Sequence, residues 1–137
     1  MRTAIVIHGL ADARAALAAG DALRLPVTLI SGPGGGSYAG PAWFNEVVRA
    51  ASAEFPQVAV TAILDCDDAP GHALGAFRAG VKAVRFTGRE DVAEKLRDIA
   101  ASLDAELITD EVETLDLRAH RDPVAACTSW LNAHVAA

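Results

Sequence analysis

The feature of this sequence that most constrains its fold is a set of five short aliphatic runs. Each run is nearly continuous in Val, Ile, Leu and Ala, which is typical of strands covered on both faces, as in a parallel sheet. Helical patterns separate the runs, so the chain repeats a strand–helix alternation that predicts βα units with right-handed crossovers. The runs are Thr3–Ile7, Val27–Ile30, Val58–Leu64, Ala83–Phe86 and Ala105–Ile108.

Capping residues predict where the helices between these runs begin and end. Gly20 is predicted to interrupt or end the first helix, and Gly80 to end the third. Asp68 is expected to cap the helix that Pro70 begins, since short polar side chains favour that position. The predicted helix starts are at Asp12, Pro41, Pro70, Arg89 and Asp122.

These elements predict one α/β domain over residues 1–137. A chain of 137 residues fits one domain. We expect an open, mainly parallel sheet of about five strands with helices on both faces, flavodoxin-like or receiver-like. The alternative is half of a TIM barrel, because five βα units are too few to close eight strands. Residues 112–117 are either a sixth, edge strand or an extended surface arm.

Composition excludes several classes of protein and of partner. The formal net charge of −6 argues against a nucleic acid or an anionic membrane as the main partner. No apolar stretch approaches the roughly 18–20 residues of a membrane span, and the first apolar run is too short for a signal peptide. The two cysteines form no disulfide framework, so we expect a cytoplasmic protein.

The glycine-rich segment after the second run is the sharpest local feature. Ligands bind at the carboxyl ends of strands in open α/β sheets and in barrels. Successive glycine N–H groups there can form an anion-binding nest, to which the helix from Pro41 adds its dipole. The alternative is a simple connecting turn. The predicted ligand-binding residues are Ser31, Gly34, Gly35, Gly36, Ser37 and Arg89.

Titratable residues also follow the strands. His8 and Asp65 are the candidate acid–base groups, and a hydrogen-bonded structural role is the alternative for the histidine. The leading prediction is that the chain holds no metal ion. The alternative is a Mg²⁺ ion held by Asp65 and Asp67 together with water molecules. In the structural interpretation, Asp67 instead complements the dipole of the helix that follows. Cys66 lies among these carboxylates, which argues against a reactive thiolate.

Three segments between Val27 and Leu103 carry a family resemblance: Val27–Ser31 followed by Gly32-Pro33-Gly34, then Val58–Cys66, and then 76–81 followed by Ala83–Phe86. They are similar to the third strand, the fourth strand, and the fourth helix with the fifth strand of bacterial response-regulator receiver domains, so this part of the chain resembles the middle and end of that family. The places of the family's acceptor aspartate, hydroxyl residue and lysine are taken by Ser31, Asp65 and Thr87. The resemblance therefore implies a flavodoxin-like fold and no phosphoacceptor activity.

Two further resemblances concern shorter segments. Gly80–Gly88 is similar to quarter-units of phosphate-binding TIM barrels, and a half-barrel could close only with a second copy of the chain. Ala39–Phe44, after the glycine-rich segment, resembles small bacterial α/β proteins, and that membership implies no activity.

The sequence thus predicts a cytoplasmic bacterial α/β domain that binds a small phosphate- or carboxylate-bearing ligand at the carboxyl ends of its strands. The alternative is a non-catalytic, receiver-like module for interaction or dimerisation. The sequence indicates neither a reaction nor a cofactor.

Overall fold

The structure is a computed structural model that describes residues 2–135, apart from the side chains of Ser37 and Tyr38. The chain divides into two compact units. The described residues of unit 1 are 2–30, 46–61 and 111–135, and those of unit 2 are 31–45 and 62–110.

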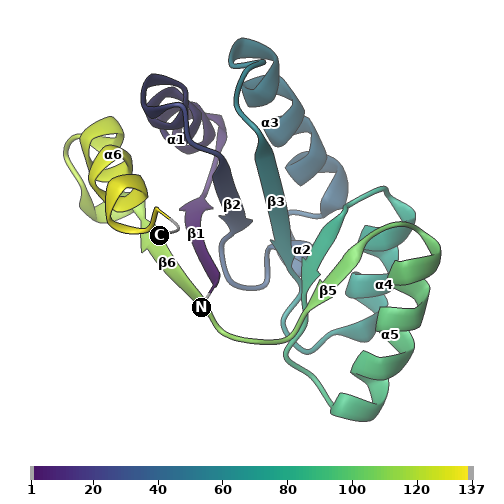
Figure 1. The fold of residues 1–137 in the computed structure, drawn as a ribbon. Helices are drawn as coiled ribbons and strands as arrows, with labels where there is room; N and C mark the ends of the chain where they lie inside the picture. The colour runs from purple at the N-terminus through teal and green to yellow at the C-terminus, as the bar shows by residue number, and fades with distance from the viewer. Residues whose placement is uncertain (1, 136–137) are drawn as a thin grey trace. The chain divides into compact units, whose positions relative to one another are not determined.

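Strands and helices alternate along most of the chain (Figure 1). A strand coincides with most of each of the five aliphatic runs, so the predicted alternation is confirmed. The residues after Glu111, for which a strand or a surface arm was expected, form a sixth strand. The elements are β1 (Arg2–Ile7), α1 (Leu10–Leu23), β2 (Val27–Ser31), α2 (Gly35–Tyr38), α3 (Pro41–Glu54), β3 (Val60–Asp65), α4 (Pro70–Arg78), β4 (Ala83–Arg85), α5 (Glu90–Ser102), β5 (Glu106–Ile108), β6 (Val112–Asp116), η1 (Leu117–Ala119) and α6 (Pro123–Ala133).

Across residues 2–135 the strands form one six-stranded sheet in the order β5-β4-β3-β2-β1-β6. β6 pairs with β1, β4 with β3, and β5 with β4, each time in parallel. The α/β class and the parallel sheet are therefore confirmed. Strands β1 to β5 are neighbours in chain order, as in a βα-barrel, whereas flavodoxin-like sheets have the order 2-1-3-4-5. The topology is thus that of the half-barrel alternative.

Unit 1 is built around β1, whose residues Ala4–Ile7 are buried. Helices α1 and α6 lie side by side in this unit (Figure 1). α1 packs closely because its inward positions are small. A Cβ at Gly20 would collide with the side chain of Val27 and would lie 3.0 Å from the carbonyl oxygen of Leu25. Gly20 therefore lets helix and strand approach, and the prediction that it interrupts or ends α1 is wrong.

Unit 2 contains β4 and β5 and the carboxyl part of β3. α4 and α5 lie side by side (Figure 1) and bury small residues such as Ala73 and Ala93. α4 ends as predicted at Gly80, which has φ +90°. There the N–H of Gly80 donates to the carbonyl of Phe77 and that of Val81 to Ala76, the Schellman pattern that glycine favours.

Two predicted helix caps are wrong. α1 has Gly9 as its N-cap, and Asp12 lies inside the first turn, where its carboxylate accepts a hydrogen bond from the backbone N–H of His8. α4 has Ala69 as its N-cap and no side-chain cap, so Asp68 does not fill that role. The helix starts expected at Pro70 and at Asp122-Pro123 are confirmed, and Asp122 is a true cap, since its side chain accepts from the N–H of Ala125.

Within residues 2–135, no helix combines the length and the apolar composition needed to cross a membrane.

Candidate functional site

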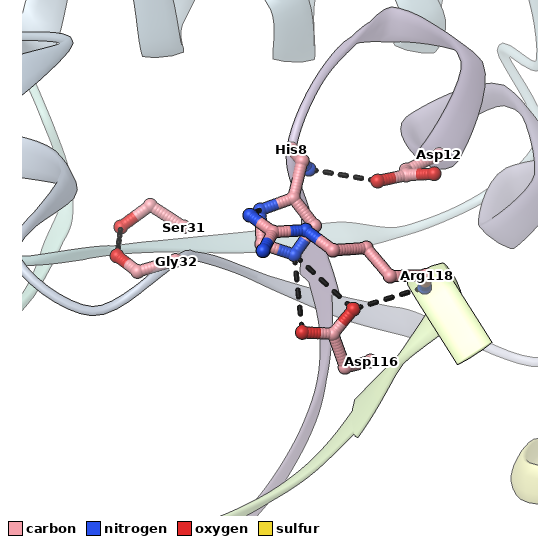
Figure 2. Close-up of polar contacts among 6 residues, drawn as sticks. All are labelled: His8, Asp12, Ser31, Gly32, Asp116 and Arg118. Atoms are coloured by element: carbon pink, nitrogen blue, oxygen red, sulfur yellow. Dashed lines mark hydrogen bonds and ion pairs between the residues drawn. The ribbon is translucent and has the colours of Figure 1, made fainter.

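In unit 1, the end of β1 and the end of β6 bring three polar side chains together. Val6 and Asp116 are partners in the parallel pairing of these strands. His8, two residues after Val6, therefore lies at the same edge of the sheet as Asp116. Arg118 lies just beyond, in η1. Figure 2 shows the imidazole of His8 between the guanidinium of Arg118 and the carboxylate of Asp116. We call these three residues the His8 cluster.

Both ring nitrogens of His8 have partners. Nε2 lies 3.1 Å from both Oδ1 and Oδ2 of Asp116, and Nδ1 lies 2.7 Å from Nη2 of Arg118. An arginine can only donate, so Nδ1 accepts, and the proton of a neutral ring is on Nε2, which donates to the carboxylate. The backbone N–H of His8 donates to Oδ2 of Asp12 at 2.8 Å, which fixes the residue at the start of α1.

The carboxylate of Asp116 is held in its charged form. Its pKa lies below its ordinary value, first because the backbone N–H of Arg118 donates to it, with further contributions from the hydrogen bond and charge of His8 and from the charge of Arg118. Partial desolvation opposes this shift. Asp116 is thus the anionic end of the cluster, and it orients the imidazole.

Arg118 is the chemically available member of the His8 cluster. It is exposed, and its only side-chain hydrogen-bond partner among residues 2–135 is the uncharged nitrogen of His8, while the Asp116 carboxylate feels its charge without a side-chain hydrogen bond to it. A guanidinium has five N–H donors and normally pairs with a carboxylate or a phosphate. The cluster can therefore offer a positive charge and several donors to an anion from solvent.

In unit 2, the ends of β2 and β3 are joined by Ser31 and Asp65, both of which are buried. The backbone N–H of Asp65 donates to Oγ of Ser31 at 2.9 Å, and that hydroxyl donates to the carbonyl of Gly32, the bond drawn in Figure 2. Oδ1 of Asp65 accepts from the N–H of Asp67. These contacts fix the turns after both strands.

Arg85 on β4 supplies the charge that balances Asp65. The two residues are partners in the parallel register, and Nη1 of Arg85 lies 3.7 Å from Oδ2 of Asp65. Nε of Arg85 is buried and has no hydrogen-bond partner within the described chain. A largely buried arginine facing a buried carboxylate stabilises the fold chiefly by avoiding an unpaired charge.

The glycine-rich segment is a packed turn. Gly34 has φ +70°, and a Cβ on it would lie 2.8 Å from Oδ2 of Asp67. A Cβ on Gly35 would lie 2.6 Å from Oγ of Ser31. The N–H of Gly35 donates to the carbonyl of Gly32, so it already has a partner.

Residues 35–38 form the helix α2, although a loop was expected there. A Cβ on Gly36 would lie 2.6 Å from Sγ of Cys66. The absence of side chains at Gly35 and Gly36 thus allows the turn after β2 to pack on the turn after β3. Whether Gly34, Gly35 and Gly36 also bind an anion stays a prediction, and the predicted hydroxyl of Ser37 lies outside the described side chains.

In unit 2, Arg89 is already paired with a carboxylate. Arg89 is exposed and donates to the carboxylate of Asp91 through Nε and Nη2, at 3.0 and 2.7 Å. Among the described residues, no group of three or more His, Cys, Asp or Glu side chains is placed to hold a metal ion, so the alternative of Mg²⁺ on Asp65 and Asp67 gains no support.

Cys66 fits the expectation of an unreactive thiol. Burial, and then the charges of Asp65 and Asp67, raise its pKa to about 12. The thiolate, which is the nucleophilic form, is therefore scarce at neutral pH.

Three residues of these sites were not predicted from the sequence. Arg85 carries a local signal, because it is a charged residue inside an apolar strand. Asp116 and Arg118 follow a segment for which a strand was only one alternative, and 108 residues separate Asp116 from His8.

Comparison with known proteins supports the fold alone. No protein-family model matches the chain, and no curated protein matches its sequence. Among solved structures, the chain is similar to one described as "a putative fructose-1,6-biphosphate aldolase" from Coccidioides immitis, with a TM-score of 0.64 and 17% identity. The match covers 77% of this chain and 39% of that one, so the chain spans well under half of its neighbour. A flavodoxin-like fold is not confirmed.

Proposed function

We propose that the carboxyl end of the strands in unit 1 binds a small anion that carries a phosphate or a carboxylate group. Arg118 is the charged contact and His8 is the acid–base group. The observation that carries the proposal is the hydrogen bonding of Arg118: its guanidinium donates to a neutral imidazole nitrogen and, among residues 2–135, to no carboxylate.

A bound anion would compete with His8 for Arg118. Two parallel N–H···O bonds from a guanidinium to a carboxylate or phosphate are stronger than one bond to a neutral acceptor. When Arg118 turns to the anion, Nδ1 of His8 is released, while Asp116 still holds Nε2. A histidine oriented by a carboxylate through one nitrogen, with the other nitrogen free, can accept or donate a proton at the ligand.

The glycine-rich turn of unit 2, with Arg89, is the second location for the anion. Its amide groups and the start of α3 favour an anion in principle. Against it stand the carboxylate of Asp67 at Gly34 and the pairing of Arg89 with Asp91. The contacts within unit 1 therefore support the His8 cluster better.

Titration with inorganic phosphate, followed by NMR at constant ionic strength, tests the proposal. We expect saturable shifts at His8, Asp116 and Arg118 at millimolar phosphate, and their loss in Arg118→Gln. Arg121→Gln is the matched control, because Arg121 is also exposed and lies three residues further on.

Two other results would contradict the proposal. Shifts confined to Gly34, Gly35 and Gly36 would move the anion site to unit 2. No saturable shift at either location would leave no support for anion binding, and self-association in light scattering would then favour the interaction module.

A further inference from the structure

Unit 1 contains a cavity of about 320 Å³ that is separate from the His8 cluster. It lies between the first residues of β1, the segment before and within β2, and the end of α6. Thr3 on its wall precedes His8 by five residues of extended chain, about 16 Å at the usual rise of a strand. The cavity is thus at the amino end of β1, and the proposed anion site is at its carboxyl end.

Two rings form an aromatic corner of this cavity. Trp130 and His134 both line it, with ring centroids 4.1 Å apart and ring planes inclined by 43°. Ile5 and Leu131 add apolar wall. Such a surface favours a planar apolar ligand, because aromatic rings pack well in offset or tilted arrangements.

The polar groups of the cavity favour a ligand that donates a hydrogen bond. Nδ1 of His134 lies 2.8 Å from the carbonyl oxygen of Trp130. That oxygen can only accept, so Nδ1 carries the proton and Nε2 of the neutral ring presents a lone pair. Nε2 lies 3.9 Å from Oε2 of Glu113, beyond hydrogen-bond distance.

The charge near this acceptor selects against anions. The carboxylate of Glu113 lies beside Nε2 of His134. The lining also includes Thr3 and Thr28, which carry hydroxyls, and Trp130, which carries an indole N–H. Apolar walls with a few convergent polar groups and a volume above roughly 300 Å³ are typical of small-molecule sites.

We propose that this cavity binds a small, uncharged aromatic molecule that carries one hydroxyl or N–H donor. Its ring packs against Trp130 and its donor bonds to Nε2 of His134. The inference is independent of the proposed anion site, since the two share no residue and favour ligands of different charge.

Phenol and toluene test this proposal, because they are similar in size and only phenol has a donor. We expect phenol to give saturable NMR shifts at Thr3, Thr28, Trp130 and His134, and to bind more tightly than toluene. His134→Phe keeps a ring and removes the acceptor, so it should weaken phenol binding about 2- to 10-fold and leave toluene binding unchanged. His120→Phe, at an exposed position outside this lining, is the matched control.

A second variant keeps the test valid if His134→Phe does not fold. Thr28→Leu fills part of the cavity from a strand position and should weaken both phenol and toluene, whereas Thr114→Leu on β6 should weaken neither. Three results would overturn the proposal: no saturable shift at these residues, an unchanged preference for phenol in His134→Phe, or the same shifts on raising the protein concentration without phenol. The last would mean that a second copy of the chain covers the cavity.

Discussion

Arginines near the carboxyl ends of the strands are paired differently in the two units. In unit 1, Arg118 donates to a ring nitrogen of His8. In unit 2, Arg85 and Arg89 each face a carboxylate. A carboxylate that accepts from a guanidinium occupies its donors and balances its charge, whereas the imidazole that accepts from Arg118 brings no negative charge, and the carboxylate of Asp116 acts on Arg118 only through its charge. Whether an arginine at a strand end can bind an anion therefore depends on the group it already pairs with, and its position alone is not enough.

The first prediction tests whether the two units unfold together. Burial raises the pKa of Cys66 in unit 2 to about 12 and that of Cys127 in unit 1 to about 11, so both thiols are largely protonated. The thiolate, the form that iodoacetamide alkylates, is therefore scarce at both positions while the protein is folded. We expect iodoacetamide to label both cysteines only in urea, and at the same urea concentration, because β2 and β3 contribute residues to both units.

Mass spectrometry of the labelled peptides separates the two cysteines. Labelling of one cysteine at a clearly lower urea concentration than the other would show that the units unfold independently, and it would contradict the prediction of one domain over residues 1–137.

The second prediction concerns the charge pair of unit 2. Asp65→Asn keeps an acceptor for the N–H of Asp67 and removes the charge opposite Arg85, which then stays largely buried without a counter-charge. We expect a loss of about 2 kcal/mol in the free energy of unfolding, measured with urea. Asp91→Asn is the matched control: it removes the exposed partner of Arg89 and should cost below about 0.5 kcal/mol.

Adding Arg85→Met to Asp65→Asn sharpens this prediction. Removing the orphaned charge should recover part of the loss, because the two residues are coupled. Equal effects of Asp65→Asn and Asp91→Asn would mean that burial does not distinguish the two pairs.

The third prediction compares a helix glycine from each unit. A Cβ added at Gly75 in α4 would meet open space, so Gly75→Ala should stabilise the protein by about 0.5–1 kcal/mol through helix propensity. In Gly20→Ala the new methyl group would collide with Val27, and overpacking of this kind costs about 1–3 kcal/mol. The melting temperature should rise in Gly75→Ala and fall in Gly20→Ala. Equal shifts of the melting temperature would contradict the close packing of α1 on β2.

These contacts show why the sequence predicted the strands better than the sites. Local composition is enough to place a strand such as Thr3–Ile7 or a helix start such as Pro123. Helix α2 was not predicted because glycine has low helix propensity. The single turn of α2 packs on Ser31 just before it and on Cys66 after β3, and the second contact cannot be read from the local sequence.

Long-range pairing also decides which residues form the His8 cluster. His8 itself was a candidate because it follows a strand. Its partners come from β6 and η1, and nothing in the local sequence of β6 indicates that it pairs with β1. The same limit applies to Arg85, whose partner Asp65 is set by the register of β3 and β4.

The fourth and smallest effect concerns the pH dependence of unit 1. The pKa of Asp116 is lower in the folded protein than its ordinary value of 3.8, so its charged form stabilises the fold above that pH. The contribution is lost as the pH falls below 3.8 and through the lowered value. Asp116 is half-exposed, so Asp116→Asn should cost less than about 1 kcal/mol at neutral pH, and the difference should vanish in strong acid. Urea unfolding of both proteins at several pH values measures this, and a difference that persists in strong acid would show that Asp116 acts through packing rather than through its charge.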